Sequence, residues 1–150
     1  DVKLDWKLPT WFQTNKEFIL KNLHSKEDIK EYQIMHDCGK TYCITIDEEG
    51  RRHFPDHANV SRDTFSKISN NKIVADLISK DMVFHTIKAD EVEEFLNSNS
   101  LQTVLTLLVT SLCELHSNAS MFGGSSSQSF KIKYKQLDKR GNQVLKLILK

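Results

Sequence analysis

Apolar and polar positions alternate in the segment 41–54, which predicts a β-hairpin. Tyr42, Ile44 and Ile46 alternate with polar neighbours, and the run is rich in β-branched residues. The residues 48–50, Glu-Glu-Gly, form the expected turn, and the returning strand would end before Pro55.

A second alternation predicts a hairpin over residues 130–149. Phe130, Ile132 and Tyr134 alternate with three lysines, and the sequence from 138 to 142 has the composition of a turn. The lysines would then share one face of the hairpin, while the apolar side chains would face the core.

Helical periodicity covers most of the chain between these two segments. The residues 101–115 carry a broad apolar face and are expected to form the central core helix. A short strand is expected at 82–87. The other expected helices cover residues 14–23, 59–80 in two pieces, and 90–96. This order predicts an α+β fold, an antiparallel β-sheet built from hairpins and packed against several α-helices.

The length of 150 residues and the 39% hydrophobic fraction fit one globular domain spanning 1–150, with a flexible loop near 122–129. Because the chain begins at Asp1, we interpret it as excised from a larger protein. The three cysteines are too few for a disulfide framework, which favours a reducing compartment, nuclear or cytoplasmic. The longest apolar run, 101–115, is interrupted by polar residues, so no membrane partner is expected.

The near-neutral net charge of +1 conceals a strongly basic C-terminal segment. The residues 128–150 contain seven basic side chains and one acidic side chain, a net charge of +6, whereas 26–50 and 76–100 are acidic. A basic face could bind phosphates or an acidic partner; the alternative is a solvated face that protects an edge strand from aggregation. The candidate binding residues are Lys131, Lys133, Lys135, Lys139, Arg140 and Lys146, with Arg51 and Arg52.

The stretch HDCGKTYC, residues 36–43, contains residue types that bind metals. Cys38, Cys43, His53 and His57 nearly fit the spacing of a zinc finger. However, the gap of nine residues between the cysteines and the histidines is short, and a proline separates the two histidines. A pair of reduced thiols beside surface histidines is therefore the preferred interpretation, and no metal is assigned.

The sequence motifs that could indicate catalysis match their known patterns poorly. The Gly-Lys-Thr at 39–41 lacks the upstream glycine of a phosphate loop and precedes an expected strand. Cys113 and His116 could share a helix face, but a buried structural thiol is the simpler interpretation. The sequence therefore assigns no catalytic residue and no cofactor, and no motif resembles a known family closely enough to name it.

These observations favour a non-catalytic protein–protein interaction or assembly domain, with a protein partner and with self-association as a homodimer left open. The alternative is a nucleic-acid-binding domain that uses the basic C-terminal segment on phosphates. A small enzyme or a zinc-binding module is the lesser alternative.

Overall fold

The computed structural model describes residues 6–150 and corrects the predicted fold class, because the protein is mostly helical. It is 66% helical, and within the described residues one pair of short antiparallel strands forms the β-structure. No helix among those residues is long and apolar enough to cross a membrane. The chain divides into two compact units, which we call unit 1 (1–23 and 83–150) and unit 2 (24–82).

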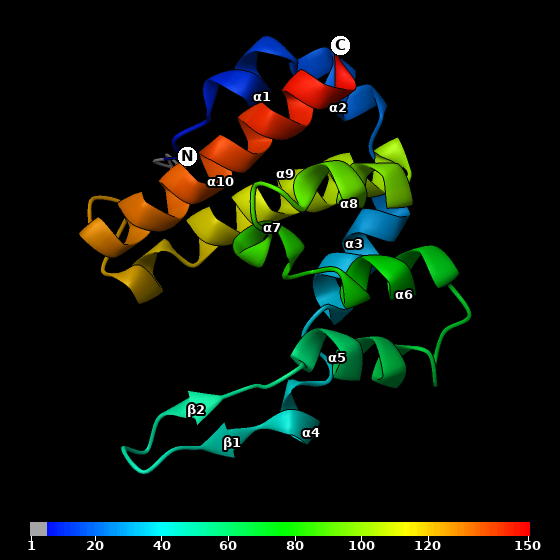
Figure 1. The fold of residues 1–150 in the computed structure, drawn as a ribbon. Coiled ribbons are helices and arrows are strands. Elements are labelled where there is room, and N and C mark those ends of the chain that lie inside the picture. Colours follow the sequence, from blue (N-terminus) through cyan, green and yellow to red (C-terminus); the bar gives the residue numbers. More distant parts are fainter. Residues whose placement is uncertain (1–5) are drawn as a thin grey trace, which may run out of the picture. The chain divides into compact units, whose positions relative to one another are not determined.

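The long C-terminal helix α10 is the centre of unit 1 and contacts α1, α7, α8 and α9 (Figure 1). Ser100 caps the start of helix α9, because its side chain accepts a hydrogen bond from the Thr103 backbone N–H. The helix is buried along most of its length. The helices of unit 1 are α1 (Thr10–Thr14), α2 (Lys16–Lys21), α7 (Val83–Thr86), α8 (Val92–Ser98), α9 (Leu101–Ser117), the 3₁₀ helix η1 (Ala119–Phe122) and α10 (Gln128–Ile148).

The hairpin predicted over 130–149 is wrong, because these residues lie in the single helix α10. Its apolar positions follow a 4-3-4-3-4 spacing over five turns, which places them on one helix face. This repeat is longer than the alternation at 130–134, and Ile132, which the alternation would bury, is 50% exposed. The repeat consists of Phe130, Tyr134, Leu137, Gly141, Val144 and Ile148.

The start of α10 also has a conventional helix signal. The side chain of Ser127 accepts a hydrogen bond from the backbone N–H of Phe130, as an N-cap does. The residues 138–142, expected to form a turn, lie inside the helix, because tertiary burial outweighs their turn propensity.

Unit 2 contains four helices and the small hairpin. Helix α6 packs against α3 and α5, and α4 packs against α5. Its elements are α3 (Lys26–Met35), α4 (Lys40–Cys43), β1 (Thr45–Ile46), β2 (Arg52–His53), α5 (His57–Phe65) and α6 (Lys72–Ser79).

The hairpin predicted over 41–54 is confirmed only in its central part. Thr45 pairs with His53 and Ile46 pairs with Arg52, on either side of the expected turn. The preceding residues of the predicted strand, 41–43, form the last part of α4 instead.

The predicted helices agree with the structure more closely than the predicted hairpins. The expected helices at 101–115 and 90–96 correspond to α9 and α8, and the break expected within 59–80 falls between α5 and α6. The strand expected at 82–87 is wrong, because α7 occupies Val83–Thr86 as one helical turn.

A close contact between Trp11 and Gly141 joins the N-terminal part of unit 1 to α10. Trp11 is 3% exposed, and a Cβ atom at position 141 would overlap the Trp11 indole ring. Glycine in a helix interior is less stable than alanine by about 1 kcal/mol. The close approach of the Trp11 indole explains why α10 nevertheless has a glycine at position 141.

We predict that Gly141→Ala destabilises unit 1 despite its higher helix propensity. Overpacking of this kind costs about 1–3 kcal/mol, so the free energy of unfolding measured with urea should fall. The double variant Gly141→Ala/Trp11→Phe should recover part of the loss, since the smaller ring leaves space for the methyl group. An increase in stability for Gly141→Ala alone would contradict this packing.

Candidate metal centre

The His36–Asp37 pair lies where α3 ends in unit 2. His36 follows the last residue of α3, and its backbone N–H donates to the Tyr32 carbonyl oxygen. Two residues after Asp37, Gly39 contacts the backbone of α5 so closely that a Cβ atom would overlap Val60 and Ser61. The Gly39 N–H donates to the Ser61 hydroxyl oxygen at 3.0 Å. This approach brings the His36–Asp37 pair beside the start of α5.

The two histidines at this point direct the same nitrogen toward Asp37. His36 Nδ1 lies 2.9 Å from the Gln33 carbonyl oxygen, and His57 Nδ1 lies 3.2 Å from the Phe54 carbonyl oxygen. Because a carbonyl oxygen can only accept, each Nδ1 carries a proton and donates it. The other nitrogen, Nε2, faces the Asp37 carboxylate in both rings. Metal-binding histidines are commonly oriented by such a bond to a carbonyl oxygen.

Both nitrogen–oxygen distances to Asp37 exceed that of a direct hydrogen bond, and the His36 distance matches the separation of two ligands of one ion. His36 Nε2 lies 3.5 Å from Asp37 Oδ2, and His57 Nε2 lies 3.8 Å from Asp37 Oδ1. A direct N–H···O bond spans about 2.7–3.2 Å, whereas two ligands each about 2.1 Å from an ion lie about 3–3.5 Å apart. Asp37 Oδ1 is buried and has no hydrogen-bond partner among the described residues.

Asp81 supplies a second carboxylate next to His36. It follows the end of α6, is 2% exposed, and offers a ligand atom within 4.8 Å of a His36 ring nitrogen. The Tyr32 hydroxyl donates a short hydrogen bond to Asp81 Oδ1 and fixes the orientation of the carboxylate. His36 thus lies near both carboxylates, and His57 lies near Asp37. These four residues, here called the His–Asp cluster, carry imidazole and carboxylate groups, which are ligand types that suit divalent first-row ions.

A positive side chain lies at the edge of the His–Asp cluster. Lys40 Nζ is 2.7 Å from Asp37 Oδ2 and 5.3 Å from the centroid of the Phe54 ring. Its side chain is 34% exposed, so the ammonium group can reach a ligand from solvent while remaining close to the carboxylate.

The four residues considered for a zinc finger do not come together. Cys38 Sγ donates to the Ser61 carbonyl oxygen, and Cys43 Sγ lies 3.7 Å from the Gly39 carbonyl oxygen. His53 lies on the exposed hairpin, with Nε2 2.8 Å from Asp47 Oδ2. Burial raises the pKa of the Cys38 thiol, so this cysteine is held as a thiol rather than as a thiolate ligand. Of the four, only His57 belongs to the His–Asp cluster.

The basic residues predicted to share a hairpin face are redistributed by the helix. Lys131, Lys135, Lys139 and Lys146 lie within one face of α10, since four- and seven-residue steps return to similar angles at 100° per residue. Lys133 and Arg140 point to other faces, and the Arg140 guanidinium donates to the Ile87 carbonyl oxygen.

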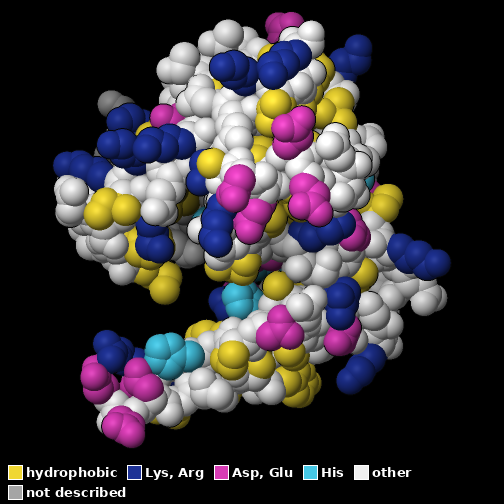
Figure 2. Space-filling model, in the orientation of Figure 1, with side chains coloured by type: hydrophobic (Ala, Val, Ile, Leu, Met, Phe, Trp, Pro, Cys, Tyr) yellow, Lys and Arg dark blue, Asp and Glu magenta, His cyan; other side chains and the backbone are white. Residues whose placement is uncertain are grey.

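Arg51 and Arg52 lie far from these residues in the sequence, on the exposed hairpin of unit 2. Arg51 forms ion pairs with Asp47 and Glu49. Figure 2 shows acidic, basic and histidine side chains mixed at this hairpin tip, so it is not a uniformly basic surface.

The pair considered as a nucleophile and base in α9 has other contacts. Burial raises the pKa of the Cys113 thiol, which disfavours the reactive thiolate. His116 Nδ1 lies 2.8 Å from the Leu112 carbonyl oxygen, and His116 Nε2 accepts from the Lys7 backbone N–H at 3.1 Å. His116 is therefore a buried structural residue, and its placement agrees with the simpler interpretation of the pair.

The sequence analysis missed His36, Asp37 and Asp81 as functional candidates. The useful signal was the adjacent His-Asp pair followed by a second histidine at position 57. It was not recognised, because the spacing of these residues in the sequence does not show that the fold brings their side chains close. Comparisons with models of protein families, with characterised protein sequences and with solved structures found no match to this chain.

We predict that Mn²⁺ or Zn²⁺ binds at the His–Asp cluster and stabilises the protein. At an ion concentration of about 100 times Kd, the free energy of unfolding should rise by about 2–3 kcal/mol. Asp37→Asn and His57→Ala should remove most of this increase in isothermal calorimetry and in thermal unfolding. His53→Ala removes a histidine from the same unit but outside the cluster, so it should bind the ion normally. Equal loss in all three variants would contradict the assignment.

Proposed function

We propose that unit 2 is the centre of a metal-dependent hydrolase that acts on phosphoesters. The observation that carries this proposal is that the Nε2 atoms of two histidines each face the Asp37 carboxylate, at 3.5 Å and 3.8 Å. A bound divalent ion in such a mixed ligand set typically lowers the pKa of a coordinated water and polarises a phosphoryl oxygen.

The protein's own residues have separate roles in this proposal. His36, Asp37, His57 and Asp81 would hold the ion, and the hydrogen bonds from the two Nδ1 atoms to carbonyl oxygens keep the Nε2 atoms directed toward Asp37. Water attacks phosphorus, the phosphorus–oxygen bond to the leaving group breaks, and the proton released by water ends on the leaving alcohol.

Lys40 supports a phosphoester as the substrate class. Its ammonium group lies beside Asp37 and is partly exposed, so it can bind an anionic phosphoryl oxygen at the rim of the cluster. A neutral carboxylic ester or amide would gain less from this charge. The proposal therefore assigns substrate binding, and not metal binding, to Lys40.

We predict metal-dependent hydrolysis of simple aryl phosphates. Protein treated with EDTA and then supplied with Mn²⁺ should release p-nitrophenolate from p-nitrophenyl phosphate or bis-p-nitrophenyl phosphate, but not from p-nitrophenyl acetate. Asp37→Asn should lower kcat/KM by about 100-fold or more, as expected for loss of several kcal/mol of transition-state stabilisation. Lys40→Gln should mainly raise KM, and His53→Ala should leave both constants unchanged.

The possible results separate the metal centre from the activity. Binding of Mn²⁺ without turnover of either aryl phosphate would identify a structural metal site and overturn the hydrolase. Metal-independent turnover, or equal turnover of the acetate, would also overturn it.

Protein binding is a second candidate function, supported by exposed apolar side chains in α4 and at the start of the unit 2 hairpin. Tyr42, Ile44 and Ile46 are 74%, 43% and 67% exposed, although all three are large and apolar. Exposed apolar side chains that are close together often mark protein contacts. The interaction or assembly role expected from the sequence, its nuclear or cytoplasmic location and its homodimer alternative remain predictions.

A further inference from the structure

A basic face on α10 combines with a groove in unit 1. The face consists of Lys131, Lys135, Lys139 and Lys146, all exposed. The first and last of these lysines are separated by 15 positions, or about 22 Å at 1.5 Å per residue of helix. Figure 2 shows lysine and arginine side chains gathered over the N-terminal half of α10.

None of the four ammonium groups forms an ion pair with a carboxylate within residues 6–150. Lys80, in contrast, pairs with Asp76 at 2.5 Å. The charges of the basic face are therefore not used to hold the described fold together, and they are available to an anionic partner.

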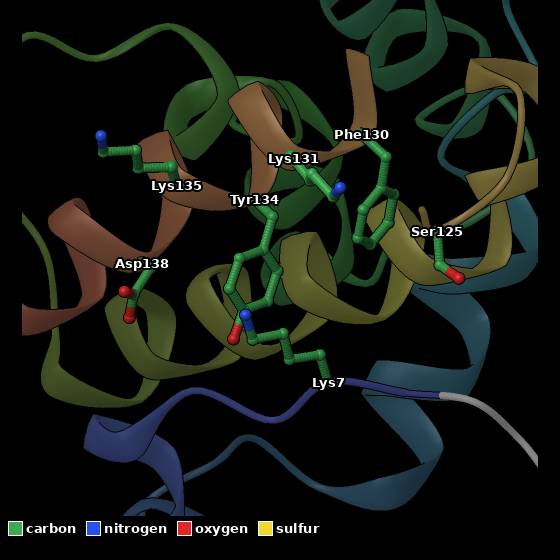
Figure 3. Close-up of a pocket in the computed structure, with 7 residues that line it drawn as sticks. All are labelled: Lys7, Ser125, Phe130, Lys131, Tyr134, Lys135 and Asp138. Atoms are coloured by element: carbon green, nitrogen blue, oxygen red, sulfur yellow. The ribbon is translucent and has the colours of Figure 1, made fainter. Parts of the chain in front are cut away.

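The groove, which has a volume of about 390 Å³, lies at the N-terminal end of the basic face. In Figure 3, Lys7 reaches from the N-terminal segment to the hydroxyl end of Tyr134, and Lys131 lies beside Phe130 and Tyr134. Lys7 Nζ is 5.1 Å from the centroid of the Tyr134 ring. The groove is lined by Lys7, Ser125, Phe130, Lys131, Tyr134, Lys135 and Asp138.

The polar groups of the groove are suited to bind an oxyanion. Burial, with a smaller contribution from the Asp138 charge, raises the pKa of Tyr134, so its hydroxyl group remains a proton donor at neutral pH. Lys7 and Lys131 add ammonium donors from two separate parts of the chain. The Ser125 hydroxyl lines the same space.

The aromatic residues beneath the groove are already packed against each other. The rings of Phe130 and Tyr134 stack with centroids 6.1 Å apart, and His116 contacts both edge-on. Phe130 is 3% exposed and Tyr134 is 9% exposed, so neither offers a free ring face for a nucleobase. Contacts to a phosphate backbone therefore fit this surface better than base stacking.

We propose that this surface binds the phosphate backbone of a nucleic acid. One phosphate lies in the groove between Lys7, Lys131 and the Tyr134 hydroxyl. The strand then follows the exposed lysines toward the C-terminal end of α10, with little dependence on base sequence. The proposal rests on unit 1 alone and is independent of the metal centre in unit 2.

The test is fluorescence anisotropy with labelled 20-nucleotide single-stranded and duplex probes in 50–200 mM KCl. Five phosphate contacts predict a slope of log K against log salt of about −3.5 for single strands and −4.5 for duplex, so affinity should fall by about 100-fold or more. Replacing the four lysines of the basic face by glutamine should remove most of this slope. Tyr134→Phe should weaken binding by about 2- to 10-fold, as expected for one lost hydrogen bond.

The matched control has four glutamine substitutions on exposed lysines elsewhere in unit 1, at Lys16, Lys21, Lys88 and Lys133. It changes the net charge by the same amount and should retain the wild-type salt slope; circular dichroism checks that both variants keep their helices. Equal losses in both variants would mean a general charge effect and overturn the site. Tighter binding of a polyglutamate peptide than of either probe would instead assign the surface to an acidic protein.

Discussion

Burial of one face of α10 is the constraint on which unit 1 depends. The apolar repeat of this helix provides the surface against which α1, α7, α8 and α9 pack. A strand would present every second side chain to the core and would place Leu137 on the face opposite Phe130 and Tyr134. The helix buries nearly the whole repeat, and burial of each large side chain contributes about 1.5–3 kcal/mol. The exposed lysines then occupy the neighbouring face, where their charges remain in water.

The contrast between helical and strand periodicity also explains how much of the fold could be predicted from the sequence. Helices α8 and α9 were predicted because only helical periodicity fits their apolar residues. The segment 130–148 contains both a two-residue alternation and a seven-residue apolar repeat. The alternation covers only the five residues 130–134. The seven-residue repeat extends to Ile148, and Ser127 marks its start, so a longer window favours a helix. The hairpin at 41–54 was predicted in part because its turn residues determine the local chain reversal.

The His–Asp cluster was harder to predict because its members are brought together by packing. His36 and Asp37 are adjacent in the sequence, but Asp81 lies 44 residues after Asp37 and comes close through the contact of α3 with α6. The small residue Gly39 permits the approach of α5, which carries His57. Periodicity detects none of these contacts. The zinc interpretation required both cysteines, whereas the residues proposed to bind the ion are histidines and aspartates.

The contact of Trp11 with Gly141 has a consequence for the order in which the protein is built on the ribosome. Unit 1 is assembled from two segments that flank unit 2 in the sequence, and α10 is translated after the other helices of unit 1. Unit 2 is continuous, so its core can form while α10 is still unsynthesised. Trp11 and the helix that contains it must therefore wait, with apolar surface accessible to chaperones, until about 130 further residues have emerged.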